Sequence, residues 1–430
     1  MKTKHLPVAL LALALLLPAL GSSVPQGGLP PFGMVAPSGP LVRKALRWHD
    51  QALTVDTHCD TPMKLLEKGW DIGRYHRPGQ PGSGCQDLIR MKEGGLDASF
   101  FAVFVAQGPR TDEGNAQARE KAVAILDAID AMFKKYPELC GLAVAPADAR
   151  RLEKQGKRAI FIGMENGYPL GHDPALIDYF YKRGVRYVTL AHTADNDICD
   201  SSTDRKDPED RGLSEWGRQV VRRLNELGVM VDVSHVSDRS FFDVLALTKA
   251  PVIASHSCAR AIANSPRNLT DDMLLALKKN GGVIQLCILR DYVKQPPPNP
   301  EREKAFEAFH KKIDETYGGW GNVKDPAEHD KLEAEYDALD ARYPEPPVYV
   351  KDAVDHIDHI VRLIGIDHVG IGTDFDGGGG LADCSDVTQL KNITIELARR
   401  GYGRKEIAKI WGGNVLRVMQ QVIDFAKKKG

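Results

Sequence analysis

The sequence predicts an α/β fold, a (β/α)8 TIM-like barrel, and three observations favour it. Eight short apolar segments recur along the chain, and each ends in polar residues. Longer stretches with helical periodicity separate these segments. The 430 residues are also enough for one large α/β domain. Strand and helix in repeated alternation favour a closed parallel barrel, and a doubly wound open sheet is the alternative.

The predicted strands follow one another over most of the chain. They cover residues 52–57, 98–105, 159–164, 186–191, 229–234, 252–255, 282–289 and 369–373. Helical periodicity is clearest over residues 115–135, 213–227 and 271–279. Thr270 is suited to cap the last of these helices, because its hydroxyl can accept from a free backbone N–H of the first turn.

One segment breaks this alternation. Residues 294–347, between the seventh and eighth strands, contain three consecutive prolines and then two highly charged helical stretches. A solvated helical hairpin is the simpler interpretation of this insertion. Because it follows the end of a barrel strand, where active-site loops lie, a lid or an oligomer contact is the alternative.

The N-terminus has the pattern of a secretory signal peptide. Two lysines precede an apolar run over residues 6–20, and small residues follow it. A membrane anchor is the alternative, but the run is shorter than the ~20 apolar residues that a spanning helix needs. We expect residues 1–22 to be a cleaved signal peptide, 23–40 a Pro/Gly-rich leader and 41–430 the barrel domain. The expected protein is exported, periplasmic or secreted, and has no transmembrane anchor after signal cleavage.

Charge and cysteine content exclude several classes of partner and scaffold. The 57 basic and 58 acidic residues are spread along the chain and give a formal net charge of -1. No positive surface for nucleic acid or an anionic membrane is therefore expected. The seven cysteines form no C-x-x-C pair, which argues against a zinc ribbon or a dense disulfide scaffold. Their odd number leaves at least one thiol without an intramolecular partner.

Side chains suited to metal binding or proton transfer end six of the predicted strands. In barrels of this kind the active site lies at the C-terminal ends of the strands, so these side chains are expected to meet. A single histidine at a strand end is more often structural, but six strands that end this way indicate a site. The residues are His58, Asp60, Glu165, His192, His235, His256, Asp374 and Asp376.

His58 and Asp60 can bind one ion together, because residues i and i+2 of a strand project to the same side. The same H-x-D string recurs at His356, but the apolar positions around it mark a helix, where i and i+2 diverge by about 200°. We interpret His356 and His359 as surface residues that are not ligands.

Three imidazoles and two carboxylates are the predicted metal ligands. Imidazole and carboxylate without thiolate suit zinc or a similar divalent ion in a catalytic site. A single catalytic zinc usually takes three protein ligands and a water, so five ligands indicate two ions, with Glu165 able to bridge them. Two ions about 3.5–4 Å apart could share a hydroxide nucleophile and polarise a carbonyl. The predicted ligands are His58, Asp60, Glu165, His235 and His256.

With these residues the chain resembles the renal (membrane) dipeptidase family, zinc metallopeptidases of the amidohydrolase-like barrel type. The resemblance spans nearly everything from residue 53 to about residue 418. The strings that carry it are VDTHCDTP at 55–62, GMENG at 163–167, LAH at 190–192, DVSHVS at 232–237, ASHSCAR at 254–260, PRNLTDD at 266–272, IGTDFDGG at 371–378 and WGGNVLRV at 411–418.

The resemblance implies a (β/α)8 barrel with two Zn²⁺ ions per chain. One ion would be bound by His58 and Asp60 and the other by His235 and His256. Glu165 would bridge them.

The resemblance also implies roles for residues that contact the substrate. His192 would contact the substrate carbonyl or the oxyanion, Arg267 would hold the substrate carboxylate, and Asp374 would manage protons and the amino group. Strand-end reasoning does not reveal Arg267. Ala194 stands where the animal enzymes have a cysteine, so dimerisation through that cysteine is not implied, and a homodimer stays open.

The expected function is hydrolysis of the peptide bond of dipeptides by a hydroxide bound to two metal ions. The alternative is a related metal-dependent amidohydrolase that acts on β-lactams or N-acyl amino acids, for which the same site would serve. An inactive exported binding protein is a third hypothesis, from a different class. A substituted ligand would mark such a protein, and the sequence shows none.

Overall fold

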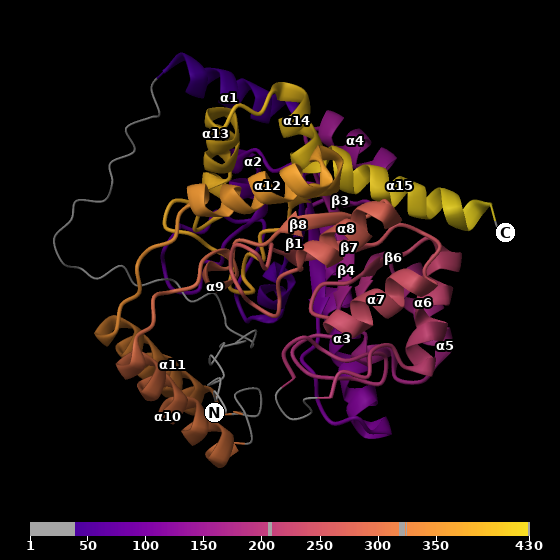
Figure 1. The fold of residues 1–430 in the computed structure, drawn as a ribbon, viewed down its shortest axis with the longest axis vertical. Coiled ribbons are helices and arrows are strands. Elements are labelled where there is room, and N and C mark those ends of the chain that lie inside the picture. Colours follow the sequence, from indigo (N-terminus) through magenta and orange to yellow (C-terminus); the bar gives the residue numbers. More distant parts are fainter. Residues whose placement is uncertain (1–38, 205–208, 318–322, 324, 429–430) are drawn as a thin grey trace, which may run out of the picture.

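The computed structural model describes residues 39–204, 209–317, 323 and 325–428 (Figure 1). The predicted signal peptide and nearly all of the predicted leader lie outside the described residues. Within the described ranges, no helix is both long and apolar enough to cross a membrane.

Eight parallel strands form a nearly closed barrel, which confirms the predicted fold class. Hydrogen bonds join neighbouring strands in chain order, and a parallel bridge between Cys59 and Phe375 brings the last strand back to the first. The barrel strands are β1 (Val55–Cys59), β2 (Ala98–Phe104), β4 (Arg158–Glu165), β5 (Val185–Thr189), β6 (Met230–Asp232), β7 (Ile253–Ser257), β8 (Val283–Leu286) and β9 (Val369–Ile371).

The observed strands match the eight predicted ones, with two differences. Five end earlier than the apolar pattern indicates, whereas β1, β4 and β7 continue through the polar residues His58, Glu165 and His256. A short additional strand, β3 (Cys140–Leu142), pairs with β4 outside the barrel and was not predicted.

Helices surround the barrel (Figure 1), and three of them lie where the periodicity predicts helices, over residues 115–135, 213–227 and 271–279. The Thr270 hydroxyl caps the helix that follows it by accepting from the backbone N–H of Met273 at 3.2 Å, as expected. The α-helices are α1 (Pro40–Gln51), α2 (Leu88–Gly94), α3 (Asp112–Lys135), α4 (Pro146–Lys154), α5 (Pro174–Lys182), α6 (Glu215–Leu227), α7 (Asp238–Leu247), α8 (Asp271–Asn280), α9 (Arg290–Val293), α10 (Pro300–Tyr317), α11 (Pro326–Arg342), α12 (Val350–Ile364), α13 (Lys391–Arg399), α14 (Arg404–Ala408) and α15 (Asn414–Lys427).

Aromatic rings fill the barrel interior beneath the polar strand ends. Phe100 stacks on Phe161 with ring centroids 4.5 Å apart and on Tyr187 at 5.4 Å. The Tyr187 ring occupies space that only a glycine leaves open, since a Cβ on Gly163 would lie 2.0 Å from it. This packed layer gives the site above it a rigid floor.

The insertion forms the predicted charged helical hairpin. Helices α10 and α11 stand apart from the barrel (Figure 1) and have a small core of their own, built on Phe309, Ile313 and Leu332. At the base of the hairpin, the guanidinium of Arg302 pairs with Glu345 at 2.7 Å. A role as a lid or an oligomer contact stays a prediction.

The prediction that His356 is a surface residue is wrong. Its imidazole is fully buried between α12 and the barrel loops. Nδ1 accepts from the backbone N–H of Ala259 at 3.0 Å, and Nε2 donates to the carbonyl of Val293 at 2.7 Å. A polar ring tolerates this apolar helix face because both of its nitrogens are satisfied. His359 is partly exposed and pairs with Asp271 at 2.7 Å.

Candidate metal centre

The predicted site residues converge at the C-terminal end of the barrel. His58 lies within β1, Glu165 is the last residue of β4, and His256 lies within β7. Another three residues each lie three positions beyond the end of a strand, where the backbone can turn across the barrel mouth. They are His192 after β5, His235 after β6 and Asp374 after β9.

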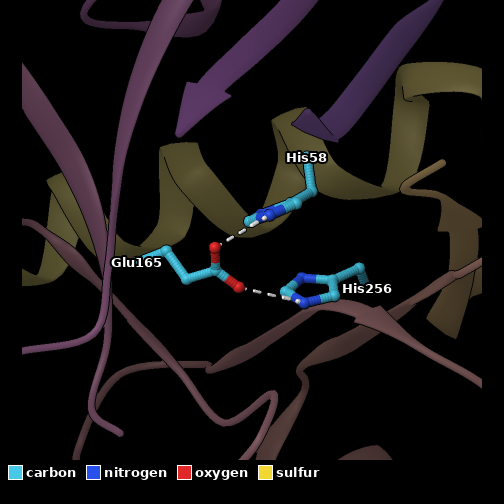
Figure 2. A group of neighbouring side chains, drawn as sticks. All are labelled: His58, Glu165 and His256. Atoms are coloured by element: carbon cyan, nitrogen blue, oxygen red, sulfur yellow. Dashed lines mark ion pairs between the residues drawn. The ribbon is translucent and has the colours of Figure 1, made fainter. Parts of the chain in front are cut away.

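The Glu165 carboxylate lies at the centre of this cluster. Its Oε2 is 3.4 Å from Nε2 of His58, and its Oε1 is 3.3 Å from Nε2 of His256 (Figure 2). Oε1 is also 3.1 Å from Nε2 of His235 and 3.7 Å from Nε2 of His192. One oxygen of this carboxylate therefore faces His58, and the other faces the imidazole nitrogens of three other histidines.

Two further carboxylates lie on the His58 side of the cluster. Asp60 Oδ2 is 3.6 Å from Nε2 of His58, and Asp374 Oδ1 is 3.9 Å from the same nitrogen. Among the described residues, three overlapping groups have ligand atoms close enough to hold a metal ion. They are His58, Glu165 and His256; Glu165, His192 and His235; and His58, Asp60 and Asp374.

The backbone at several strand ends has a positive φ angle, which residues other than glycine rarely adopt. Among the described residues, the non-glycines with positive φ are Asn166 at 74°, His235 at 69°, Asp374 at 64° and Asp376 at 65°. Each such residue costs roughly 1–3 kcal/mol. All four follow a barrel strand at the site, which is where strain that serves function is expected.

Burial keeps three of the imidazoles neutral. It lowers the pKa of His192, His235 and His256 well below the ordinary value. A neutral imidazole keeps a lone pair on one ring nitrogen, which is the form that binds a metal ion.

The pKa values of two acidic side chains in the cluster, and that of His58, are raised. Burial raises the pKa of Glu165 and raises that of Asp374 to about 8, and the nearby charge of Asp60 acts in the same direction. Burial acts to lower the pKa of His58, but Tyr187 and the Glu165 carboxylate outweigh it and raise this pKa well above its usual value. A divalent cation would replace these protons as the counter-charge.

The donor set fits a divalent metal ion. Nε2 of His58 and Oδ1 of Asp60 are buried and have no hydrogen-bond partner among the described residues. Imidazole and carboxylate donors without a thiolate suit zinc and similar ions in a catalytic site.

Arg267 adds a buried positive charge beside the cluster. It lies in the loop after β7 and is 3% exposed. Its Nη2 donates to the carbonyl of His256 at 3.3 Å, whereas Nε and Nη1 have no partner among the described residues. The adjacent Asn268 fixes this loop, since its amide donates to the carbonyl of Tyr292 at 2.9 Å and accepts from the N–H of Cys258 at 3.1 Å. A buried guanidinium with free donors is suited to bind an anion.

Asp376, the remaining acidic residue at a strand end, has a different environment. Its carboxylate accepts from the Thr61 hydroxyl at 2.6 Å and from the N–H of Cys85 at 2.7 Å. It belongs to none of the three potential metal groups in the described part of the chain. Asp376 therefore joins two loops beside the site.

The fold and the cluster define a class of protein, a (β/α)8 barrel with a metal-binding centre at its strand ends. A family model described as membrane dipeptidase, peptidase family M19, matches residues 42–430. The chain therefore belongs to the membrane dipeptidase family of metallopeptidases, and the resemblance inferred from its motifs is confirmed.

Named relatives agree with this membership. Dipeptidase ataJ of Aspergillus terreus (strain NIH 2624 / FGSC A1156) is 32% identical over 373 residues, which are 80% of this chain and 78% of that protein. Dipeptidase tcpJ of Claviceps purpurea (strain 20.1) is 30% identical over 378 residues, with 86% and 77% of the two chains covered.

Solved structures share the fold. The crystal structure of the probable dipeptidase PvdM from Pseudomonas aeruginosa is 32% identical, with a TM-score of 0.77 and coverage of 90% of this chain and 99% of that chain. A metallopeptidase from Rhodobacter sphaeroides, liganded with a phosphinate mimic of the dipeptide L-Ala-D-Ala, is 23% identical, with a TM-score of 0.67 and coverage of 86% and 99%.

Proposed function

We propose that this chain is an exported dipeptidase that binds two Zn²⁺ ions and cleaves dipeptides with a free C-terminal carboxylate. The central position of Glu165 carries the proposal, because one of its oxygens faces His58 and the other faces His235 and His256. Export rests on the signal-peptide pattern of the N-terminus.

In this proposal, Glu165 is shared between two pairs formed by the other four predicted ligands. His58 and Asp60 would hold one ion, His235 and His256 would hold the other, and Glu165 would be shared. Bound divalent ions supply Lewis-acid polarisation of a carbonyl and lower the pKa of water.

The residues around the ligands supply proton transfer and charge stabilisation. His192 is buried, its ring packs on Phe104 with centroids 4.7 Å apart, and its Nε2 is directed toward Glu165. As a neutral imidazole it would donate an N–H to the carbonyl oxygen as negative charge develops there. The Asp374 carboxylate would take the proton that the attacking water loses and deliver it to the leaving amine.

Metal analysis is the direct test of the proposed centre. Purified protein dialysed under zinc-replete conditions should retain two ions per chain, because five ligands exceed what one catalytic zinc takes. Chelation should remove dipeptide hydrolysis, and added Zn²⁺ should restore it. A single tightly held ion would contradict the two-ion proposal. Assays with a β-lactam and an N-acyl amino acid beside the dipeptide test the alternative substrate classes.

Arg267→Met should erase the preference for dipeptides with a free carboxylate. An arginine fork binds a carboxylate through two parallel charge-assisted hydrogen bonds, so it would fix the C-terminal end of a short substrate. A hydrogen bond to a charged group is worth roughly 1.5–3 kcal/mol, which corresponds to a preference of about tenfold to a hundredfold. The measurement compares kcat/KM for a dipeptide and for its C-terminal amide in wild type and variant.

Arg183 offers a matched control away from the site, because it precedes β5 at the opposite end of the barrel. Its guanidinium is already paired with Asp127 at 2.8 Å and with Asp130 at 2.9 Å. Arg183→Met should therefore leave the preference for the acid unchanged. Equal cleavage of acid and amide by the wild-type enzyme would rule out the clamp.

A further inference from the structure

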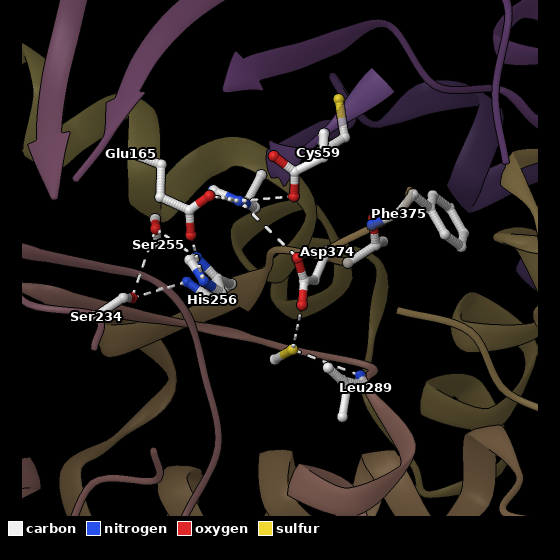
Figure 3. A network of polar contacts seen from close by, with 12 residues as sticks. Cys59, Glu165, Ser234, Ser255, His256, Leu289, Asp374 and Phe375 are labelled. Atoms are coloured by element: carbon white, nitrogen blue, oxygen red, sulfur yellow. Dashed lines mark hydrogen bonds and ion pairs between the residues drawn. The ribbon is translucent and has the colours of Figure 1, made fainter. Parts of the chain in front are cut away.

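A chain of hydrogen bonds leads from the His256 ring to a buried carboxylate below the site. The Ser255 hydroxyl lies 2.8 Å from Nδ1 of His256 (Figure 3). The same hydroxyl is 2.6 Å from Oδ2 of Asp232. Asp232 is the last residue of β6, and Ser255 and His256 lie on the neighbouring strand β7.

Asp232 is fully buried, and four donors surround it. Its Oδ1 accepts from the backbone N–H groups of Ser234 at 3.0 Å and Ser255 at 2.9 Å. Its Oδ2 accepts from the Ser255 hydroxyl and from the Thr189 hydroxyl at 2.5 Å. Among the described residues it forms no ion pair with a cationic side chain. A buried carboxylate without such a partner is costly, so the metal centre beyond His256 is the natural counter-charge.

The direction of the hydrogen bonds follows from the chemistry of the groups. An ionised carboxylate only accepts, so the Ser255 O–H points to Asp232. The Ser255 oxygen then accepts, and the proton on the His256 ring must lie on Nδ1. This leaves the lone pair on Nε2, which faces Glu165 Oε1 at 3.3 Å and His235 Nε2 at 2.8 Å.

We propose that Asp232 and Ser255 are positioning residues that fix the tautomer of His256. They hold the ring as Nδ1–H and present the Nε2 lone pair to the metal centre. The inference rests on the proposed function only in that it takes Nε2 of His256 as a metal ligand. The tautomer itself can be measured in protein without bound metal.

The other ligand histidines differ in this respect. Nδ1 of His235 has no hydrogen-bond partner among the described residues. Nδ1 of His58 meets the Tyr187 hydroxyl at 2.8 Å, and a phenol can donate or accept. Of these three histidines, only His256 has a carboxylate that fixes the donor and the acceptor in the hydrogen bond to its Nδ1.

Asp232→Asn should reverse the chain of hydrogen bonds. The amide oxygen must take the place of Oδ1, where two backbone N–H groups donate, so the NH₂ group faces Ser255. The Ser255 hydroxyl would then accept from the amide and donate to Nδ1 of His256. The ring proton would move to Nε2, where it blocks the metal-binding nitrogen.

The test reads the tautomer in the metal-free protein and then the metal affinity. Imidazole ¹⁵N chemical shifts, assigned by the loss of signals in His256→Gln, should show Nδ1–H in wild type and Nε2–H in Asp232→Asn. Ser255→Ala should give mixed tautomers, and Ser255→Thr should restore Nδ1–H. Zn²⁺ titration should show one of two ions weakened by about 10- to 100-fold in Asp232→Asn and Ser255→Ala.

Ser99→Ala is a matched control. Ser99 is a buried serine on the barrel strand β2, away from β6 and β7, and its side chain contacts the Cys59 thiol at 3.5 Å. This variant should keep both the tautomer and the metal affinity, whatever it does to the melting temperature.

The outcomes separate the two proposals. An Nε2–H tautomer in wild type, or an unchanged tautomer and affinity in Ser255→Ala, would overturn the positioning role. If Asp232→Asn does not fold, the Ser255 variants alone decide. Expected tautomers in a protein that binds no Zn²⁺ would support the hydrogen-bond chain and contradict the metal centre.

Discussion

Replacing Glu165 by glutamine should release metal and abolish turnover together. The carboxylate faces Nε2 of His58 with one oxygen and Nε2 of His235 and His256 with the other. In either orientation, an amide turns an NH₂ group toward one of these sets, where it can neither bind a cation nor neutralise its charge. Loss of a residue that only hydrogen-bonds to a metal ligand typically lowers metal affinity by about 10- to 100-fold. Loss of a ligand shared by two ions should therefore lower it by at least about 100-fold.

Metal content after dialysis and kcat/KM with a dipeptide measure both effects in the same sample. Asp376→Asn is the matched control, because Asp376 is also a buried carboxylate at the barrel mouth but bonds to Thr61 and Cys85. It should retain both ions. A Glu165→Gln variant with full activity would show that this carboxylate does not join the two halves of the site.

The barrel was predictable because its pattern is local. Most residues of the barrel strands are buried on both faces, so these strands read as short apolar runs, and six of the eight predicted strands end in side chains of the site. Strand β3 (Cys140–Leu142) was missed because it pairs with β4 outside the barrel, so the regular alternation of eight strands with helices leaves no place for it. His356 was misplaced because its burial depends on two backbone groups, at Ala259 and Val293, that only the folded chain brings together.

The site residues could be predicted only where they lie at the C-terminal ends of barrel strands, where active sites of this fold are found. His58, Glu165 and His256 lie in the last positions of their strands, so the rule finds them. Arg267 lies in a loop beyond β7, and nothing local distinguishes it from a solvated arginine; the family resemblance was the only signal. The contact of Asp232 with Ser255 crosses from one strand to the next, so it depends on the register of the sheet.

Asp374→Asn should keep its metal ions and lose most of its turnover. Asp374 lies beside the cluster, with Oδ1 3.9 Å from His58 Nε2, and its strained backbone at φ 64° directs it there. Asparagine preserves this shape but cannot exchange a proton.

Proton transfer typically contributes about 10²- to 10⁴-fold, and kcat should fall by that factor. The alternative is that Asp374 binds a metal ion together with His58 and Asp60. Metal content and kcat, measured on one preparation, distinguish this ligand role from a role in proton transfer. The pH profile gives a second readout, because a limb of the kcat curve that reports this carboxyl group should disappear in the variant. Loss of an ion from Asp374→Asn would make the residue a ligand, and unchanged kcat would exclude it from proton transfer.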